Sequence, residues 1–285
     1  MPELRVLLNS LIREGTAQLE RAGIPEPRRQ VLRIWSDLHG YGLGEALLEG
    51  VFPVEHDLAE DFQRAIQRRA SGEPLAHVTG WAGFRHLNLR SDRRALIPRP
   101  ETEGLVELLL QRVKTGIIAD IGTGCGCIAL SLVIEGAFSR VIGVDCSADA
   151  LALARWNLDM MGNPAVDFVQ GELCRPLSPG SLDALISNPP YLTLDEYAAL
   201  DGSVRDWEPA LALRSGVDGL EATTGLLNEA RAVLRPGGWL ALEVDCTRST
   251  VAAQLASGYG WDDVSLHLDL FGRERYLLAR RSETR

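Results

Sequence analysis

The stretch ADIGTGCGCIAL, residues 119–130, decides the fold of this chain. An apolar run ends at Ile121, and three glycines at alternate positions lead into a second apolar run. Glycine permits a tight turn from a strand into a helix and lets a ligand approach the backbone closely. The spacing is G-x-G-x-G: Cys127 stands where the dinucleotide fingerprint requires a glycine, and no G-K-[ST] follows as in a P-loop. The stretch therefore predicts a strand–loop–helix unit and weakens both of those nucleotide-binding assignments.

Strands and helices alternate along the chain after Thr115. The predicted strands are GIIADIG (116–122), RVIGVD (140–145), AVDFVQG (165–171), LDALISN (182–188), WLALEVD (239–245) and a final pair around WDDVSLHLD (261–269) and RERYLLARR (273–281). Helical periodicity falls between them, notably over residues 147–162 and 224–238. This alternation is typical of parallel βαβ units, and the short DLFGRE connection predicts a closing hairpin.

The first part of the chain has a different pattern. Apolar residues recur at helical spacing over residues 3–22, 28–42 and 54–74, which predicts a small helical domain over 1–72 or a helical extension packed on the main domain. Short alternating runs with glycines then predict a β-hairpin linker over 73–100. A further helix is expected within 97–113.

Composition narrows the class of protein. The chain has 285 residues, of which 46% are hydrophobic and 24% charged, and its net charge is −10. This acidity disfavours nucleic acid as a partner, because such binding depends on Lys and Arg neutralising phosphates. An odd number of cysteines without a C-x-x-C pair predicts neither a disulfide framework nor a metal site. We expect a cytoplasmic location without a secretory signal or membrane span.

Polar side chains follow the predicted strands where a parallel sheet binds its ligands, at the carboxyl ends. Asp145 ends the second strand, and a carboxylate there can accept hydrogen bonds from both ribose hydroxyls of an adenosine. Glu172 follows the third strand, near the place of an adenine edge. Asp145 could instead cap the next helix, a role that Ser147 could also take. Together with Asn188 after the fourth strand, these residues predict a nucleoside cofactor site.

The segment ISNPPYL, residues 186–192, leaves the fourth strand through two prolines, which fix the backbone and cannot continue a sheet. An amide nitrogen is a poor nucleophile because its lone pair is delocalised. An enzyme that methylates such a nitrogen should accept hydrogen bonds from its N–H groups, and the Asn188 side chain and the Pro189 carbonyl are suitable acceptors. Tyr191 can pack against the planar group. The alternative is a proline-rich turn with a capping asparagine.

Several segments together resemble the HemK/PrmC family of release factor glutamine methyltransferases. They are LIPRPETEGLVE (96–107), DIGTGCGCIAL (120–130), SNPPY (187–191), WEPALALRSGVDGL (207–220) and LRPGGWLALEV (234–244). The resemblance runs from about residue 72 to the C-terminus. It implies an α/β, Rossmann-like S-adenosylmethionine-dependent methyltransferase fold, with a seven-stranded mostly parallel sheet, an antiparallel C-terminal hairpin and a small N-terminal helical domain. The implied reaction is methylation of the glutamine side-chain amide in the Gly-Gly-Gln loop of peptide chain release factors.

The resemblance also implies roles for individual residues and segments. Residues 1–72 would be a substrate-docking domain and 101–285 the catalytic domain. S-adenosylmethionine, which leaves as S-adenosylhomocysteine, would be bound by Gly122, Thr123, Gly124, Cys125 and Gly126 at its methionine part, by Asp145 at the ribose, by Glu172 and Leu173 at the adenine, and beside Asn188. The glutamine amide would be bound by Asn188, Pro189, Pro190 and Tyr191, of which Asn188, Pro189 and Tyr191 would be catalytic.

Some residues of the matching segments receive no derived role, and two depart from the family pattern. Arg99, Pro100 and Glu101 would lie near the mouth of the pocket, and Glu208 and Pro209 match the pattern without an assigned function. Cys125 stands where the family has another small residue, and Asp245 stands where it has glycine.

Two other functions remain open from the sequence. A nucleic-acid methyltransferase acting on an adenine or guanine amino group would need a basic channel, and the clusters RRQVLR (28–33) and QRRASG (67–72) keep this alternative. An adenosine-binding module without catalysis is the other, and the intact Asn-Pro-Pro-Tyr argues against it.

Overall fold

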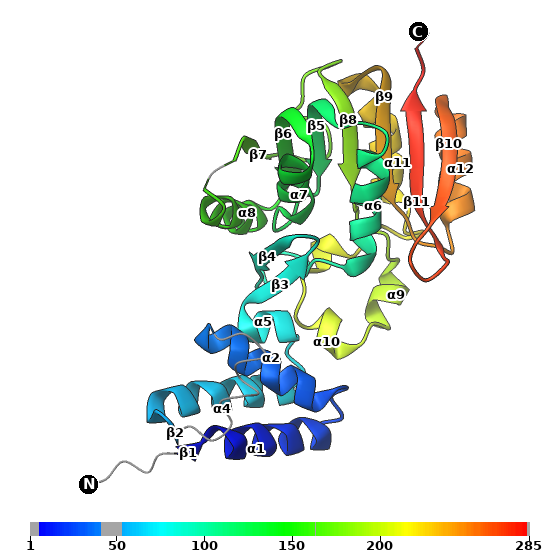
Figure 1. Cartoon of the computed structure of the whole chain (residues 1–285). Helices are drawn as coiled ribbons and strands as arrows, with labels where there is room; N and C mark the ends of the chain where they lie inside the picture. The colour runs from blue at the N-terminus through cyan, green and yellow to red at the C-terminus, as the bar shows by residue number, and fades with distance from the viewer. Residues whose placement is uncertain (1–5, 41–52, 163, 284–285) are drawn as a thin grey trace. The chain divides into compact units, whose positions relative to one another are not determined.

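The chain divides into two units in a computed structural model that describes residues 6–40, 53–162 and 164–283 (Figure 1). The first unit takes in Met1–Trp81 and Asp201–Trp207, and the second takes in Ala82–Leu200 and Glu208–Arg285.

The first unit is helical, as the periodicity predicts. Its helices are α1 (Leu8–Arg21), α2 (Pro27–His39), α4 (His56–Ala70), α5 (Leu75–Thr79) and the short α10 (Gly202–Arg205), and its strands β1 (Val6–Leu7) and β2 (Pro53–Val54) pair antiparallel. One face of α1, α2 and α4 is buried in a common apolar core that includes Leu11, Ile34 and Phe62. Residues 3–5 and 41–42 of the predicted helices lie outside the described residues.

The predicted hairpin linker over 73–100 is wrong at its start. Residues Leu75–Thr79 form helix α5, and the strand pair begins only with β3 (Trp81–Phe84) and β4 (Leu87–Arg90). The reason is packing, because Val78 of α5 is buried in the helical core. Phe84 and Leu89, in contrast, are buried in a core of the second unit. The two units accordingly divide after Trp81 and not after residue 72.

The second unit is built on a seven-stranded sheet, and this prediction is confirmed (Figure 1). Its strands are β5 (Thr115–Ile121), β6 (Ala137–Asp145), β7 (Val166–Gln170), β8 (Leu182–Ser187), β9 (Leu234–Glu243), β10 (Trp261–Leu268) and β11 (Glu274–Arg281). The spatial order is β10-β11-β9-β8-β5-β6-β7. Strands β9, β8, β5, β6 and β7 run parallel, while β11 pairs antiparallel with both β9 and β10. The chain thus closes with the expected hairpin.

Helices cover both faces of this sheet. They are α6 (Pro100–Leu110), α7 (Cys127–Glu135), α8 (Ala148–Met160), α11 (Glu221–Val233) and α12 (Ser249–Gly258), with short helices α9 (Leu194–Ala198) and η1 (Ala210–Ala212) in a connection. Successive strand residues enter opposite cores: Leu278 packs with α6, α7 and α8, while Leu277 packs with α11 and α12. The predicted helix over 224–238 ends at Val233, because the following Arg-Pro-Gly-Gly cannot continue a helix and enters β9.

The register of the parallel strands brings their ends to one edge. Ile121 of β5 pairs with Val144 of β6 on one side and with Ser187 of β8 on the other. Ser187 pairs in turn with Leu242 of β9. The residues that end or follow these strands therefore emerge together, and they are Gly122, Asp145, Asn188 and Glu243.

Candidate active site

The glycine loop, residues 122–126, needs its glycines for backbone conformation. Gly122, Gly124 and Gly126 have φ of +71°, +56° and +87°, in the left-handed region that favours glycine. The Gly122 and Thr123 N–H groups donate to the Val144 carbonyl at 2.8 and 3.0 Å. The loop is thus held to the end of strand β6, and the predicted strand–loop–helix unit is confirmed by β5 and α7.

The side chain of Asp145 holds the same loop by accepting hydrogen bonds. One carboxylate oxygen accepts the Gly124 N–H at 2.9 Å, and the other accepts the Ser147 N–H at 2.9 Å. Ser147, not Asp145, caps helix α8, because its side chain accepts the Ala150 N–H. A carboxylate can accept about four hydrogen bonds, so Asp145 keeps lone pairs for a ligand.

The glycine loop has open space above two of its glycines. A Cβ placed on Gly122 would meet nothing within 4 Å, and one on Gly124 would come only to 3.8 Å of Ala95. Backbone groups and the Asp145 carboxylate are therefore accessible along one side of the loop. Cys125 differs, because its side chain is buried in the apolar core and leaves only its backbone for a ligand.

Two buried polar side chains brace the loop from below. Asp120 accepts the Thr123 hydroxyl at 2.6 Å and the Ala129 N–H at 3.2 Å, and its complete burial raises the pKa of the carboxyl to about 7. The Asn157 side chain donates to the Cys125 carbonyl at 3.0 Å. These contacts fix the loop from its buried side.

The residues expected at the adenine follow β7. Glu172 is exposed and forms an ion pair with Arg175 at 2.5 Å. Leu173 has φ of +48°, and its side chain packs against the core beside Gly225 of α11. Both lie after a strand that pairs with β6, the strand that carries Asp145. Their assignment to the adenine stays a prediction.

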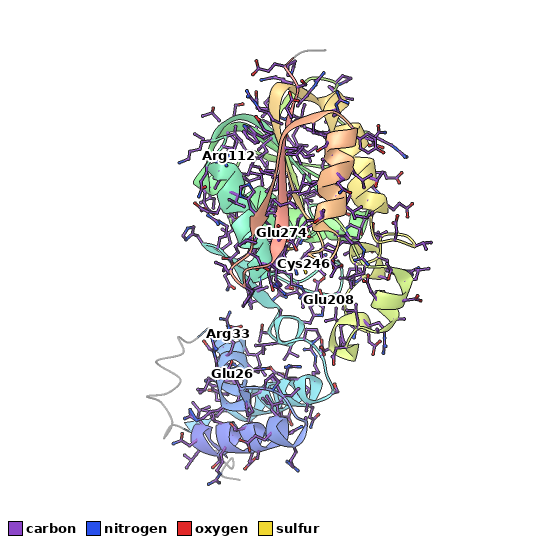
Figure 2. All side chains as sticks on the ribbon, turned by 90° about the vertical axis from the view of Figure 1, so that its right-hand side faces the viewer. Glu26, Arg33, Arg112, Glu208, Cys246 and Glu274 are labelled. Atoms are coloured by element: carbon purple, nitrogen blue, oxygen red, sulfur yellow. The ribbon has the colours of Figure 1, made fainter. Side chains whose placement is uncertain are left out.

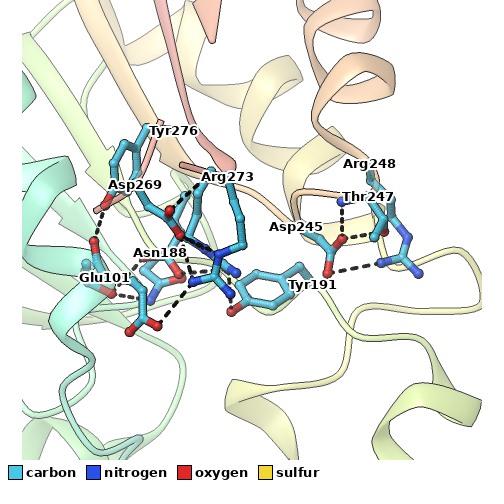
Figure 3. A network of polar contacts seen from close by, with 12 residues as sticks. Glu101, Asn188, Tyr191, Asp245, Thr247, Arg248, Asp269, Arg273 and Tyr276 are labelled. Atoms are coloured by element: carbon cyan, nitrogen blue, oxygen red, sulfur yellow. Dashed lines mark hydrogen bonds and ion pairs between the residues drawn. The ribbon is translucent and has the colours of Figure 1, made fainter. Parts of the chain in front are cut away.

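Asn188 follows β8, the strand that pairs with β5 on the side away from β6, and Figure 3 shows it in a network of polar contacts. The Ser187 hydroxyl donates to the Ile121 carbonyl at 2.6 Å, which ties the end of β8 to the end of β5. The Asn188 amide donates through Nδ2 to the Thr102 hydroxyl of α6 at 3.0 Å. Because Thr102 is occupied with the nitrogen, the Asn188 oxygen, Oδ1, is left for another donor. The side chain is partly exposed, whereas Pro189 is buried and holds the turn.

Glu243, at the end of β9, lies behind Thr102. It accepts the Thr102 hydroxyl at 2.7 Å, and its other oxygen is 3.8 Å from Arg275 Nη1. Burial raises the pKa of the Glu243 carboxyl to about 7, against the opposing effects of Thr102 and Arg275. A carboxylate, a hydroxyl and an amide thus form one chain of hydrogen bonds that ends at Asn188.

Tyr191 is held at the other end of the Asn-Pro-Pro-Tyr loop. Arg275 donates to its hydroxyl at 3.3 Å, and the Arg275 guanidinium lies 5.9 Å from the centre of the ring. Burial and the nearby Glu243 raise the pKa of Tyr191 to about 12, so the phenol is neutral at physiological pH. The ring is therefore a fixed apolar face beside Asn188 and not a base (Figure 3).

A network of charges from the closing hairpin surrounds these residues (Figure 3). Asp269 accepts from Arg273 at 2.8 Å and from Arg275 at 3.3 Å, and Arg273 also reaches Glu101 of α6 at 3.4 Å. The Tyr276 hydroxyl donates to the Glu101 carbonyl. The hairpin and the first turn of α6 are in this way held together beside the loop.

Three of the residues without a derived role, Arg99, Glu101 and Glu208, form polar contacts in the structure. Arg99 forms an ion pair with Glu208 at 2.6 Å, and the buried Glu208 also accepts the Ile97 N–H at 3.0 Å. Figure 2 shows the position of Glu208 in the chain. Asp245 accepts the Thr247 N–H at 2.7 Å and lies 3.5 Å from Arg248, so it organises the turn from β9 into α12. This departure from the family pattern is accommodated by local hydrogen bonds.

Sequence reasoning missed the support behind Asn188. Thr102 lies inside the quoted PRPETE segment and Glu243 ends a predicted strand, but their bond joins residues far apart in the chain. Asn157 gave a weak signal, since asparagine is a poor helix former inside an otherwise regular helix. No sequence pattern distinguishes Arg275 from its charged neighbours.

Comparison with known proteins connects both units to described families. The PrmC N-terminal domain family matches residues 10–80, and the methyltransferase small domain family matches residues 100–200. A Deinococcus radiodurans protein named release factor glutamine methyltransferase is 41% identical over 282 residues, which cover 96% of this chain and 99% of the relative. A Streptomyces coelicolor protein of the same name is 37% identical over 284 residues, covering 97% and 99%.

A solved structure agrees with the fold of the second unit. A methyltransferase from Pyrococcus furiosus superposes with a TM-score of 0.53 at 20% identity, covering 70% of this chain and 91% of that one. At this identity the likeness concerns the fold alone.

Proposed function

The chain belongs to the family of release factor glutamine methyltransferases, and we propose that it methylates the side-chain amide nitrogen of the glutamine in the Gly-Gly-Gln loop of peptide chain release factors. The observation that carries the proposal is the orientation of Asn188. Its nitrogen is engaged by Thr102 at 3.0 Å, which leaves its oxygen to accept an N–H of a substrate amide.

The Asn-Pro-Pro-Tyr loop, residues 188–191, is called the amide loop. It would act by positioning and electrostatics. Asn188 Oδ1 and the Pro189 carbonyl accept the two N–H groups of the glutamine amide, which raises electron density on its nitrogen and aims it. Tyr191 packs against the amide plane. S-adenosylmethionine supplies the methyl group from a sulfonium and leaves as S-adenosylhomocysteine. A nitrogen–carbon bond forms as the sulfur–carbon bond breaks, and the nitrogen then gives one proton to solvent.

The glycine loop would hold that cofactor. Gly122, Thr123, Gly124 and Gly126 with the Cys125 backbone would surround the methionine part, and Asp145 would accept the ribose hydroxyls. Glu172 and Leu173 would flank the adenine. The support is the open backbone above Gly122 and the lone pairs left on Asp145. No metal is needed for this reaction.

The helical unit would dock the release factor. The support is the match of residues 10–80 to a domain found at the N-terminus of this family. Among the described residues, no helix is long and apolar enough to cross a membrane. We infer a cytoplasmic place of action from the substrate, because translation terminates there.

The basic clusters of the helical unit give little support to nucleic acid as the substrate. Arg33 is paired with Asp37 at 2.6 Å and Arg68 with Glu73 at 2.5 Å, so their charges are neutralised within the unit. Phosphate binding requires cations that can release counterions, and paired arginines contribute less to it.

A methyl-transfer assay with labelled S-adenosylmethionine tests the proposal. The acceptors are a purified release factor, the same factor with its loop glutamine changed to alanine, total RNA and duplex DNA. We expect label on the unaltered factor alone. Label on nucleic acid, or equal label on both forms of the factor, would show that the proposed substrate is wrong.

A further inference from the structure

Thr102 and Glu243 form a buried pair behind Asn188. Thr102 is 2% exposed and Glu243 is 1% exposed, so both are shielded from water. The Thr102 hydroxyl lies 2.7 Å from Glu243 Oε2 and 3.0 Å from Asn188 Nδ2. Thr102 is placed by the first turn of α6, where its N–H donates to the Arg99 carbonyl at 3.0 Å. The pair is called the Thr102–Glu243 pair below.

The chemistry of this pair allows one direction of hydrogen bonding. An ionised carboxylate can only accept, so Thr102 must spend its single proton on Glu243. The hydroxyl oxygen then has only lone pairs to offer to Asn188. The group of Asn188 that faces it must be the NH₂, and the carbonyl oxygen must point away from it. The donor pattern of Thr102 alone fixes which end of the Asn188 amide faces it.

The reverse orientation of Asn188 would leave two acceptors facing each other. Asn188 Oδ1 would meet the Thr102 oxygen without a proton between them, in a partly buried place where a lost hydrogen bond is costly. The fixed NH₂ therefore fixes the opposite end of the amide as an acceptor. Above the Glu243 pKa of about 7 the carboxylate imposes this direction, and Arg275, 3.8 Å away, favours that ionised form against the effect of burial.

We propose that the Thr102–Glu243 pair positions Asn188 as a hydrogen-bond acceptor and thereby makes the site select an amide over a carboxylate. The inference rests on the proposed function, in which Asn188 accepts an N–H of the substrate glutamine. A glutamine offers N–H donors to the Asn188 oxygen and to the Pro189 carbonyl. A glutamate in the same place offers only acceptors, and two fixed acceptors repel it.

The consequence is a specific signature for loss of the pair. When the Thr102 hydroxyl is absent, Asn188 is free to turn and present its NH₂ to a carboxylate. Binding of a glutamate should then improve relative to glutamine. Loss of structure alone would weaken the binding of both and would leave their ratio unchanged.

The test uses the full-length enzyme and two forms of a release factor. The glutamine form is the substrate, and the form with the loop glutamine changed to glutamate is a competitive inhibitor. The assays are run well above pH 7, where Glu243 is ionised. The variants are Thr102→Val, which keeps the shape without the hydroxyl, and Thr102→Ser, which keeps the hydroxyl without the methyl group.

We expect Thr102→Val to lower kcat/KM about tenfold, the effect of one lost hydrogen bond of roughly 1.4 kcal/mol. The ratio of the inhibition constant of the glutamate form to the KM of the glutamine form should shrink by a similar factor. Thr102→Ser should restore both values to near those of the wild type. Unchanged discrimination in Thr102→Val would overturn the inference.

A matched control comes from the far layer of helices. Thr223, in the first turn of α11, is fully buried, and its hydroxyl has no hydrogen-bond partner among the described residues. Thr223→Val makes the same chemical change without touching the site. It should leave kcat/KM and the discrimination between the two forms as in the wild type. A loss of discrimination as large as that of Thr102→Val would contradict a specific role for Thr102.

Glu243→Gln provides an independent variant, should Thr102→Val fold poorly. A glutamine can donate as well as accept, so Thr102 is no longer forced to donate to it. Discrimination between the glutamine and glutamate forms should decrease as in Thr102→Val. The double variant should lose little more discrimination than either single variant, because the two residues act through one hydrogen-bond chain. Full discrimination in Glu243→Gln would show that Glu243 does not set the direction.

The proposed function and this inference fail in different ways. Absence of transfer to the glutamine form by the wild-type enzyme would overturn both. Normal transfer by the wild type, together with unchanged discrimination in Thr102→Val and Glu243→Gln, would overturn the inference alone.

Discussion

The two loops of the candidate site are braced by the same chemistry over very different sequence distances. Under the glycine loop, Asp120 accepts the hydroxyl of Thr123 at 2.6 Å, three residues away. Behind the amide loop, Glu243 accepts the hydroxyl of Thr102 at 2.7 Å, 141 residues away. Burial raises the pKa of both carboxyls to about 7. The support of the glycine loop is thus specified locally, whereas the support of the Asn-Pro-Pro-Tyr loop depends on the assembled sheet.

The comparison predicts that the amide loop affects turnover while the glycine loop affects cofactor binding. The largest effect is expected from Asn188→Ala, which removes the proposed acceptor for the substrate amide. Methyl transfer should fall about 100-fold or more, as when a transition-state hydrogen-bonding group is lost. The measurement is kcat with a release factor, with calorimetric titration of S-adenosylmethionine as the control. An affinity for the cofactor that falls as far as the rate would erase the distinction between the loops.

Asp145→Ala should show the opposite pattern. The variant loses the proposed ribose acceptor and the anchor of the Gly124 and Ser147 N–H groups. We expect the Kd for S-adenosylmethionine to rise at least about tenfold, with smaller change in kcat at saturating cofactor. The same titration gives the Kd. If the Kd were unchanged and kcat alone collapsed, the assignment of Asp145 to the cofactor would be wrong.

Gly104→Ala tests the packing that supports the amide side. A Cβ at this position of α6 would come to 2.5 Å of the Tyr276 hydroxyl, the group that donates to the Glu101 carbonyl. We expect the free energy of unfolding to fall by about 2 kcal/mol, because overpacking outweighs the gain in helix propensity. Urea denaturation measures it.

Gly258→Ala is the control for that change. Gly258 ends helix α12, and a Cβ there would meet nothing within 4 Å. This variant should be neutral or slightly more stable. Equal destabilisation by both substitutions would point to a general effect of alanine and not to the contact with Tyr276.

The pH dependence of stability compares the two carboxyls directly. Their folded pKa values of about 7 lie above those of an unfolded chain, so folding retains protons in the range between about 4 and 7. The free energy of unfolding should therefore fall as pH rises through this range and level off above it, by at most about 1.4 kcal/mol per pH unit for each group.

Asp120→Asn and Glu243→Gln separate the two contributions. Each variant should remove the contribution of one carboxyl to the slope of the free energy of unfolding against pH. Urea denaturation at a series of pH values measures this slope. A slope that neither variant changes would show that both carboxyls titrate normally in the folded protein.

Sequence patterns predicted the parts of the site that are encoded locally. The three glycines, Asp145 and Asn188 each end or follow a recognisable strand, and a parallel sheet necessarily gathers such ends at one edge. The strands and most helices were predicted for the same reason, because period and stop signals are short-range properties.

The remaining features depend on contacts that no short-range signal encodes. Helix α5 joins the helical unit because Val78 fits a core made by other helices. Thr102, Glu243 and Arg275 meet only when α6, β9 and β11 come together. Asp245 attracted attention as a departure from the family pattern, yet the neighbouring Glu243 is the residue that contacts the amide side.

The most direct test of the account is to locate the methyl group on the product. A release factor incubated with the enzyme and S-adenosylmethionine is digested, and the peptide that contains the Gly-Gly-Gln loop is fragmented by mass spectrometry. We predict one methyl group on the side-chain amide of the glutamine with the wild-type enzyme and almost none with Asn188→Ala. A methyl group on another residue, or an unmodified loop peptide after incubation with active wild-type enzyme, would contradict the account.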